Sequence, residues 1–132
     1  MQIEPYLFFE GRCEEALAFY RRALGAEVTS LMRNRESPEP HQPGALPPGS
    51  EDKVLHAVVR IGDTTLMVSD GRCSGQPVFQ GFALTITAPD VARADEMFAA
   101  LAEGGRVQMP LAKTFFSPRF GVETSTLKPA LT

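Results

Sequence analysis

Short stretches of alternating apolar and polar residues recur along the chain, and two longer stretches have an apolar residue every three or four positions. Alternation is typical of β-strands, and the longer period is typical of amphipathic helices. In the first half the pattern predicts a helix at 13–24 and strands at 3–9, 27–33, 53–61 and 64–69. In the second half it predicts a helix at 91–103 and strands at 80–88, 107–109 and 115–124.

The two predicted helices have matching apolar faces. The apolar positions of the first helix are Ala16, Phe19, Tyr20 and Ala23. Those of the second, each 78 positions further along, are Ala94, Met97, Phe98 and Leu101. With the order of the strands, this spacing predicts two tandem βαβββ modules. One module cannot cover its own sheet, so we expect an α+β fold in which both modules form a curved mixed sheet around a cleft, with the helices outside.

The length of 132 residues suits one domain, at 1–132. Within it we expect module one at about 1–70, module two at about 79–124 and a short tail at 125–132. Residues 34–52 hold five of the eleven prolines. Because proline has no N–H to donate to a sheet, this segment predicts a long loop, either a lid or a simple insertion.

Charge and composition narrow the class of protein. The chain has 13 Lys or Arg against 16 Asp or Glu, a net charge of −3, which argues against nucleic acid or an anionic membrane as a partner. No apolar run approaches the roughly 20 residues that span a bilayer, and the first residues have no signal-peptide pattern. The two cysteines have no metal-binding spacing and suit a reducing compartment. We therefore expect a soluble, cytoplasmic protein.

His56 is the clearest candidate for a functional side chain. It lies in the middle of a predicted strand, on the same face as Val54 and Val58, whereas His41 falls in the proline-rich loop. One interpretation is a structural histidine bonded to a neighbour, and the other is a base or metal ligand in the cleft. His56 is the best catalytic candidate, although no catalytic residue is identified.

Five further residues have two interpretations. Most aromatic rings are expected in the core, but Tyr6, Phe8 and Phe116 are candidates to line an apolar cleft for a small planar ligand. Arg119 is either a partner for a ligand carboxylate or phosphate or half of a surface salt bridge. Cys13, at a helix start, is either a small packing residue or a thiol with a lowered pKa.

A series of short motifs spans residues 1 to 124. They are Pro5-Tyr6-Leu7-Phe8-Phe9, Glu14-Glu15-Ala16, Phe19-Tyr20, His56-Ala57, Ile61-Gly62-Asp63, Leu66-Met67-Val68-Ser69-Asp70, Gly104-Gly105 and Arg119-Phe120-Gly121. In combination they resemble the PhnB-like branch of the vicinal oxygen chelate superfamily, which includes glyoxalase I, bleomycin-resistance proteins, fosfomycin-resistance enzymes and extradiol dioxygenases. The resemblance implies paired βαβββ modules, a homodimer and a ligand site in the cleft.

The resemblance also implies a divalent metal that binds two substrate oxygens and acts as a Lewis acid. The usual ligands are His and Glu on the first and last strands of each module. The matching positions here offer only weak candidates, namely Glu4, His56, Asp70 and Glu123. The segment 125–132 lacks the aromatic residues of the relatives' closing strand, so we expect that strand to be missing.

Three functions remain open. The first is a PhnB-like protein that binds a small molecule without catalysis, with a site drawn from Tyr6, Phe8, His56, Met67, Phe116 and Arg119. The second is a metal-dependent lyase, transferase or dioxygenase of the glyoxalase type. The third is a small dimeric protein that sequesters a drug.

Overall fold

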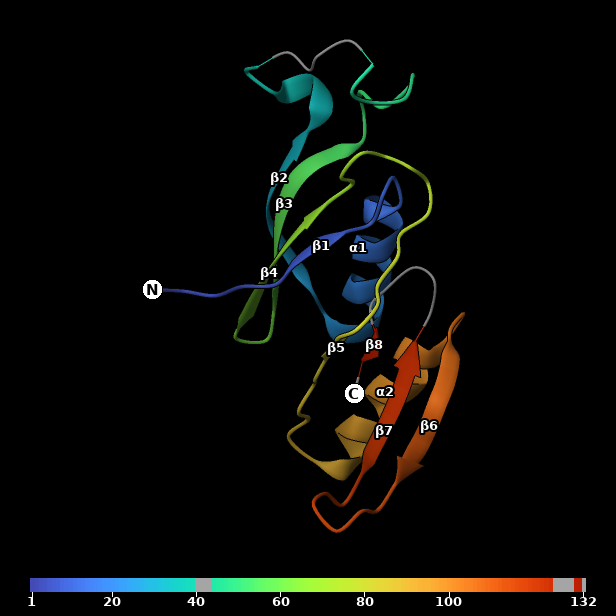
Figure 1. Cartoon of the computed structure of the whole chain (residues 1–132). Coiled ribbons are helices and arrows are strands. Elements are labelled where there is room, and N and C mark those ends of the chain that lie inside the picture. Colours follow the sequence, from blue (N-terminus) through green and yellow to red (C-terminus); the bar gives the residue numbers. More distant parts are fainter. Residues whose placement is uncertain (40–43, 125–129, 132) are drawn as a thin grey trace. The chain divides into compact units, whose positions relative to one another are not determined.

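The computed structural model of the chain describes residues 1–39, 44–124 and 130–131. These residues fall into two compact units, Met1–Pro77 and Val78–Thr132, which we call unit 1 and unit 2 (Figure 1). Each unit has one helix and one four-stranded sheet, and each is described by itself.

Unit 1 contains one long helix, a short 3-10 helix and four strands. In chain order they are β1 (Tyr6–Phe8), α1 (Cys13–Leu24), β2 (Glu27–Arg33), η1 (Asn34–Glu36), β3 (Val54–Ile61) and β4 (Thr64–Ser69). The strands form sheet A in the order β1-β4-β3-β2. β1 is parallel to β4, and the other neighbours are antiparallel, so the sheet is mixed.

Unit 2 repeats this plan. Its elements are β5 (Ala83–Leu84), α2 (Val91–Ala102), β6 (Arg106–Ala112), β7 (Phe120–Thr124) and β8 (Ala130–Leu131). Sheet B has the order β5-β8-β7-β6, with β5 parallel to β8 and the other neighbours antiparallel. In both sheets, the spatial order is therefore the first, fourth, third and second strand of the module. This confirms the α+β fold class and the repeated βαβββ module.

The sequence of α1 explains its two ends. Glu14 and Glu15 lie in the first turn and Arg21 and Arg22 in the last, where each charge complements the helix dipole. Gly25 ends the helix in the left-handed conformation, with φ of 67°. The buried residues of the helix are Cys13, Ala16, Leu17 and Tyr20.

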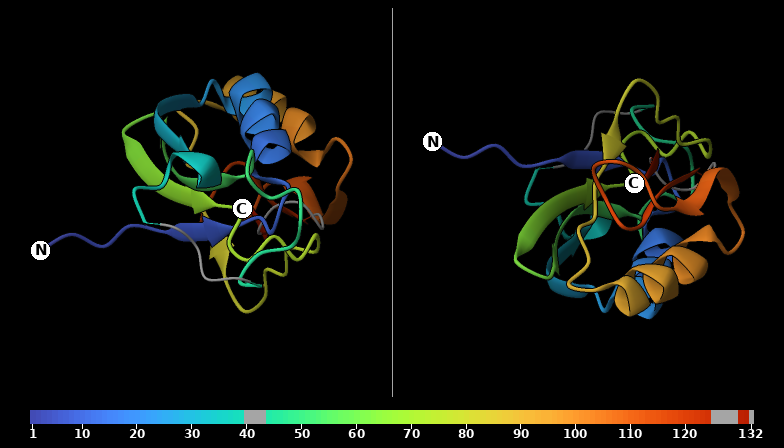
Figure 2. Two further views of the ribbon diagram at one scale, coloured as in Figure 1. Left: turned by 90° about the horizontal axis from the view of Figure 1, so that it is seen from above. Right: turned by 90° about the horizontal axis from the view of Figure 1, so that it is seen from below.

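One face of sheet A packs under α1 and forms the core of unit 1 (Figure 2). The buried residues on this face of the strands are Leu7, Ala57, Val59, Leu66 and Val68. They are paired across the sheet, as Leu7 with Val68 and Val68 with Ala57. Because side chains alternate between the faces of a strand, the residues between them point away from α1.

Two of the strands predicted in the second half, 80–88 and 115–124, are longer than those observed, whereas the strand predicted at 107–109 is part of the longer β6. The predicted strand at 80–88 is reduced to the two residues of β5. Among the described residues, β5 pairs with the two residues of β8, Ala130 and Leu131. The predicted strand at 115–124 starts only at Phe120, because the Ser117 amide bonds the Thr114 hydroxyl and Pro118 follows, forming a turn.

The segment 125–132 was expected to lack a closing strand. The structure instead places β8 there, paired with Ala83, Leu84 and Glu123. A closing strand is thus present at Ala130–Leu131. Residues 125–129 and 132 lie outside the described part of the chain.

The proline-rich segment 34–52 has no strand among its described residues, as predicted. It begins with the one-turn helix Asn34–Glu36, and the Asn34 side chain bonds the Ser50 carbonyl across the loop at 2.8 Å. His41 lies outside the described residues. In the part of the chain that the structure describes, no helix has the length and apolar character needed to cross a membrane.

Candidate functional site

The face of sheet A that points away from α1 brings together four of the predicted ligand-binding residues. We call this surface the open face; it carries Tyr6, Phe8, His56 and Met67. Tyr6 pairs with Met67 across two strands, and Met67 pairs with Val58 on the next. Tyr6 and Phe8 are 41% and 45% exposed, although both are large aromatic residues. The open face is therefore an accessible apolar surface.

Tyr6 and His56 form the polar centre of this face. The Tyr6 hydroxyl lies 3.1 Å from Nδ1 of His56, within hydrogen-bond distance. The two rings meet edge to face, with centroids 5.5 Å apart, and the rings of Tyr6 and Phe8 are 4.7 Å apart. Among the described residues, Tyr6 is the hydrogen-bond partner of the His56 ring. The histidine is thus held by a partner yet still lies on the open face.

The chemistry of this pair follows from counting its protons. A neutral imidazole has one N–H, and the tyrosine has one O–H. If the tyrosine donates to Nδ1, then Nε2–H is left to donate. If Nδ1–H donates to the tyrosine oxygen, then the hydroxyl proton is left. In both tautomers one donor remains for a ligand that supplies an acceptor.

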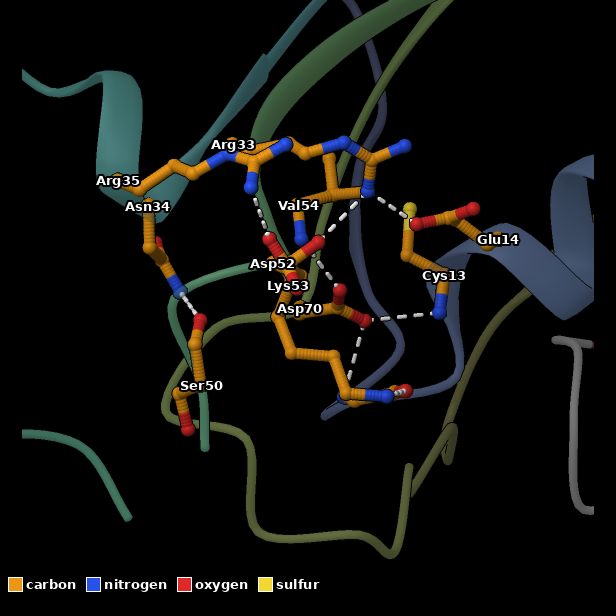
Figure 3. A network of polar contacts seen from close by, with 11 residues as sticks. Cys13, Glu14, Arg33, Asn34, Arg35, Ser50, Asp52, Lys53, Val54 and Asp70 are labelled. Atoms are coloured by element: carbon orange, nitrogen blue, oxygen red, sulfur yellow. Dashed lines mark hydrogen bonds and ion pairs between the residues drawn. The ribbon is translucent and has the colours of Figure 1, made fainter. Parts of the chain in front are cut away.

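Asp70 has a different setting, beyond the end of β4 (Figure 3). Its side chain is 1% exposed. One carboxylate oxygen accepts the backbone N–H groups of Gly11 at 2.9 Å and Cys13 at 2.7 Å, and the other accepts that of Val54 at 2.7 Å. Asp70 therefore ties three segments together, an arrangement that favours a structural role over metal ligation.

The remaining metal candidates, Glu4 and Glu123, have settings of their own. Glu4 lies before β1, where its carboxylate accepts a hydrogen bond from the Gln2 amide at 2.5 Å. Glu123 lies on β7 in unit 2 and faces α2, because Gly121 and Glu123 lie two positions apart on the same side of the strand and Gly121 contacts Phe98. Among the described residues, no three His, Cys, Asp or Glu side chains form a group that could hold a metal ion.

The donors around His56 do not fit a divalent metal of the glyoxalase type. Such sites use imidazole and carboxylate ligands. The neighbours of His56 on the open face are a phenol, a phenyl ring and a thioether. A thioether is a soft ligand that suits Cu(I). We therefore derive no step through a metal.

Phe116 and Arg119, the other two predicted ligand-binding residues, line a pocket in unit 2. This unit-2 pocket has a volume of about 480 Å³ and is bounded by segment 85–91, the inward face of α2, segment 116–121 and Glu123. Arg119 also pairs with Asp95, its Nε lying 3.3 Å from a carboxylate oxygen. The salt bridge and the pocket thus share this arginine.

Cys13 is a packing residue in this structure. It is fully buried, and burial raises the pKa of its thiol far above the usual range, with the Asp70 and Glu14 carboxylates adding to the effect. A raised pKa leaves almost no thiolate at neutral pH. The interpretation as an activated nucleophile is therefore not supported.

Sequence reasoning missed the role of the α2 face. Ala94, Met97, Phe98 and Leu101 were predicted as the apolar face of the helix, and the structure places this face in a wall of the unit-2 pocket. No local signal distinguishes an apolar helix face that is covered from one that borders a pocket. Met32, which pairs with His56 and is 40% exposed, was also missed as a neighbour of the open face, because strand register is not local information.

Known proteins resemble this chain in sequence and in fold. Residues 2–127 match the family model of the Glyoxalase/Bleomycin resistance protein/Dioxygenase superfamily. Protein YjdN of Escherichia coli is 35% identical over 129 residues, covering 94% of this chain and 88% of that protein.

Two solved structures extend the likeness. Protein PA1353 from Pseudomonas aeruginosa is 35% identical, with a TM-score of 0.83 and coverage of 99% of this chain and 94% of that one. A Bacillus cereus structure described as a putative 3-demethylubiquinone-9 3-methyltransferase, PhnB protein, is 27% identical, with a TM-score of 0.76 and coverage of 100% and 98%. The chain therefore belongs to the Glyoxalase/Bleomycin resistance protein/Dioxygenase superfamily and has PhnB-like relatives.

Proposed function

We propose that this protein binds a small planar aromatic molecule on the open face of sheet A, without a metal-dependent chemical step. The observation that carries the proposal is the hydrogen-bonded pair of Tyr6 and His56 on a half-exposed aromatic surface. Exposed aromatic rings next to one fixed polar group are typical of small-molecule sites. Membership of the superfamily supports the proposal.

The pair also selects the kind of ligand. Since it keeps one donor in either tautomer, the ligand should carry an acceptor such as a carbonyl oxygen. Its ring would lie against Phe8 and Met67, where stacking and S···aromatic contacts are available. We therefore propose an aromatic carbonyl compound as the ligand class.

A pair of matched probes tests this proposal. Acetophenone and ethylbenzene have nearly the same shape, but only acetophenone has a carbonyl oxygen. We expect acetophenone to bind roughly two- to tenfold tighter, the value of one net hydrogen bond. Titrations followed by amide chemical shifts in NMR should place the changes on β1, β3 and β4. Equal affinities would contradict the hydrogen-bonding role, and no binding at all would contradict the site.

Single substitutions separate the two members of the pair. His56→Phe keeps an aromatic ring but removes both ring nitrogens, and it leaves the Tyr6 hydroxyl as a donor, so it should weaken the preference for acetophenone. The double change Tyr6→Phe with His56→Phe removes both donors and should abolish the preference. Tyr6→Phe removes only the hydroxyl and should weaken the preference. Tyr20→Phe, the same change at a buried residue of α1, is the matched control and should leave the preference intact. Loss of the preference in Tyr20→Phe would point to a general structural effect.

We do not extend the methyltransferase activity in the Bacillus cereus description to this chain. A nucleotide-type cofactor needs a glycine-rich turn between a strand and a helix. Gly104-Gly105 instead follows the end of α2. Metal-dependent catalysis and drug sequestration remain alternatives. Unchanged NMR spectra of the probes after long incubation would support binding without turnover.

The expected homodimer and cytoplasmic location also remain proposals. The family resemblance supports the dimer, and the two unpaired cysteines suit a reducing compartment. Sedimentation should give twice the mass of the chain, and a monomer at micromolar concentration would contradict the dimer.

A further inference from the structure

The unit-2 pocket has the size of a small-molecule site. It lies entirely among residues of unit 2, between α2 and sheet B. Its volume of about 480 Å³ falls within the range of roughly 300–1,000 Å³ typical of such sites. Its walls are mostly apolar, and they include the phenyl rings of Phe98, Phe116 and Phe120. It shares no residue with the open face of sheet A.

The internal repeat allows the two units to be compared position by position. The helices α1 and α2 have 12 residues each, and they begin at Cys13 and Val91, which are 78 positions apart. Phe9 lies four positions before α1, and Thr87 lies four positions before α2. A phenylalanine of unit 1 is therefore replaced by a threonine in unit 2.

In unit 1 the ring of Phe9 fills space beside α1. Phe9 is 0% exposed, and its ring meets that of Tyr20 edge to face, with centroids 6.4 Å apart. The counterparts in unit 2, Thr87 and Phe98, both line the pocket, and Thr87 is exposed whereas Phe98 is half-buried. A small residue in place of a large core residue leaves a cavity when the surroundings do not collapse. The hollow therefore corresponds to the place that Phe9 fills in unit 1.

A tight contact keeps α2 from moving closer to sheet B. A Cβ atom added to Gly121 of β7 would lie 2.9 Å from the Phe98 ring and 2.9 Å from the Met109 carbonyl oxygen. Such a Cβ would clash, so glycine is needed for β7 and α2 to approach each other at this point. A small shift of the helix toward the sheet therefore cannot close the hollow, which stays open for a ligand.

The charged groups of the lining favour an uncharged ligand. The Nε atom of Arg119 lies 3.3 Å from a carboxylate oxygen of Asp95. Asp90 caps α2 by accepting the backbone N–H of Arg93 at 2.7 Å. Glu123 is buried and already interacts with another group of the chain. Because an ion that enters an apolar site without an unpaired opposite charge loses a large hydration free energy, a neutral molecule suits this pocket.

We propose that the unit-2 pocket binds a small uncharged molecule with two fused aromatic rings, one of which takes the place of the ring that Phe9 supplies in unit 1. The size of the ligand follows from the volume, since an apolar cavity of about 150 Å³ holds benzene and this pocket is about three times as large. The rings of Phe98, Phe116 and Phe120 offer edge-to-face contacts to such a ligand. This site is additional to the aromatic carbonyl site of the open face.

Four probes test the size and the charge of the ligand. Three share the naphthalene ring system, namely 2-methylnaphthalene, 2-naphthoate and 2-naphthylmethylammonium, and the fourth, toluene, has a single ring. We expect 2-methylnaphthalene to bind about tenfold tighter than toluene, because the second ring buries further apolar surface. It should also bind at least about tenfold tighter than either ion. Titrations followed by amide chemical shifts in NMR should place the changes in segments 85–91 and 116–121.

Substitutions that fill the hollow provide the second arm. Thr87→Phe supplies a ring from the chain itself and should weaken the binding of 2-methylnaphthalene by at least about tenfold. Thr64→Phe, the same change at an exposed position of β4 in unit 1, is the matched control and should bind like the wild type. Ala94→Leu fills the hollow from α2, and Ala99→Leu on the exposed face of α2 is its control. Thermal unfolding shows whether each variant is folded, and the alanine pair decides the question if Thr87→Phe does not fold.

Four results would overturn the proposal. Equal affinities for 2-methylnaphthalene and toluene would show that the pocket does not hold two rings, and tightest binding of an ion would assign recognition to a charged side chain. Binding that survives both Thr87→Phe and Ala94→Leu, or shifts confined to unit 1, would place the probe elsewhere. Absence of binding would show that the hollow is not a site. Acetophenone shifts in β1, β3 and β4 do not depend on these results, so the two proposals can fail separately.

Discussion

Replacing Asp70 by alanine should destabilise the protein more than any surface change. The substitution leaves the backbone N–H groups of Gly11, Cys13 and Val54 without the acceptor they contact at 2.7–2.9 Å (Figure 3). A buried donor that loses its partner costs about 1–3 kcal/mol. With some replacement by water, we expect a loss of about 3–5 kcal/mol, a large part of the roughly 5–15 kcal/mol of a typical domain.

Urea unfolding measures this loss, and two variants calibrate it. Asp70→Asn keeps one acceptor oxygen but turns an amide N–H₂ toward a donor, so its loss should lie between those of the wild type and Asp70→Ala. Asp52→Ala removes a carboxylate that pairs with Arg35 at 2.8 Å in an exposed position, where the side chains are 74% and 60% exposed. Exposed pairs contribute about 0–1 kcal/mol.

Two results would refute this reasoning. A loss below about 1 kcal/mol for Asp70→Ala would show that the three bonds do not hold the segments together. A chelator that destabilises the wild type but not Asp70→Ala would restore Asp70 as a metal ligand. We expect a chelator to change neither protein.

The other predictions concern a glycine, the cysteines and an ion pair. Gly71→Ala should cost about 2–4 kcal/mol, because φ is 56° there and the new Cβ would lie 2.7 Å from the Glu10 carboxylate. Thiol labelling followed by mass spectrometry should modify the half-buried Cys73 before Cys13, because burial raises the pKa of both thiols and Cys13 is fully buried. Glu14→Gln should slightly destabilise the protein at neutral pH, because the hydrogen bond from Arg33 lowers the pKa of Glu14. Stability that comes from a lowered pKa is lost as the pH falls through the pKa of the folded state. The difference in stability between the variant and the wild type should therefore vanish in acid.

Each of these has its own control. Gly75→Ala has φ of 87° and no atom within 4 Å of the new Cβ, so it isolates backbone strain from the contact with Glu10. Equal losses at the two glycines would show that the contact is unimportant. Labelling of Cys13 in the folded Cys73→Ser variant, or a Glu14→Gln difference that persists in acid, would contradict the other two predictions.

Features set by short-range sequence were predicted well. The bounds of α1 follow from its 3.6-residue pattern, its terminal charges and Gly25, and the structure gives the same residues. The two strands β3 and β4 flank the two-residue turn Gly62-Asp63, as predicted. The repeat of the βαβββ module was also predicted, because it follows from the order of the elements and from the spacing of 78 positions between the two helices.

Features that depend on distant partners were not predicted. β5 pairs with β8, which lies more than 40 positions away, so the alternation in 80–88 could not show which of its residues form the strand. Nor could alternation show that His56 meets Tyr6, which requires the parallel pairing of β1 with β4. Asp70 looked like a ligand for the same reason, since its three donors come from two other segments.

The pairing between β5 and β8 has a consequence for how unit 2 moves. Within the described part of the chain, β5 is joined to the rest of sheet B through the pairs Ala83–Ala130 and Leu84–Leu131. Segments with so few backbone bonds open locally at a small free-energy cost, well below that of global unfolding. Hydrogen–deuterium exchange should therefore be faster in β5 than in β1. The first strands of the two βαβββ modules would then open locally at different rates.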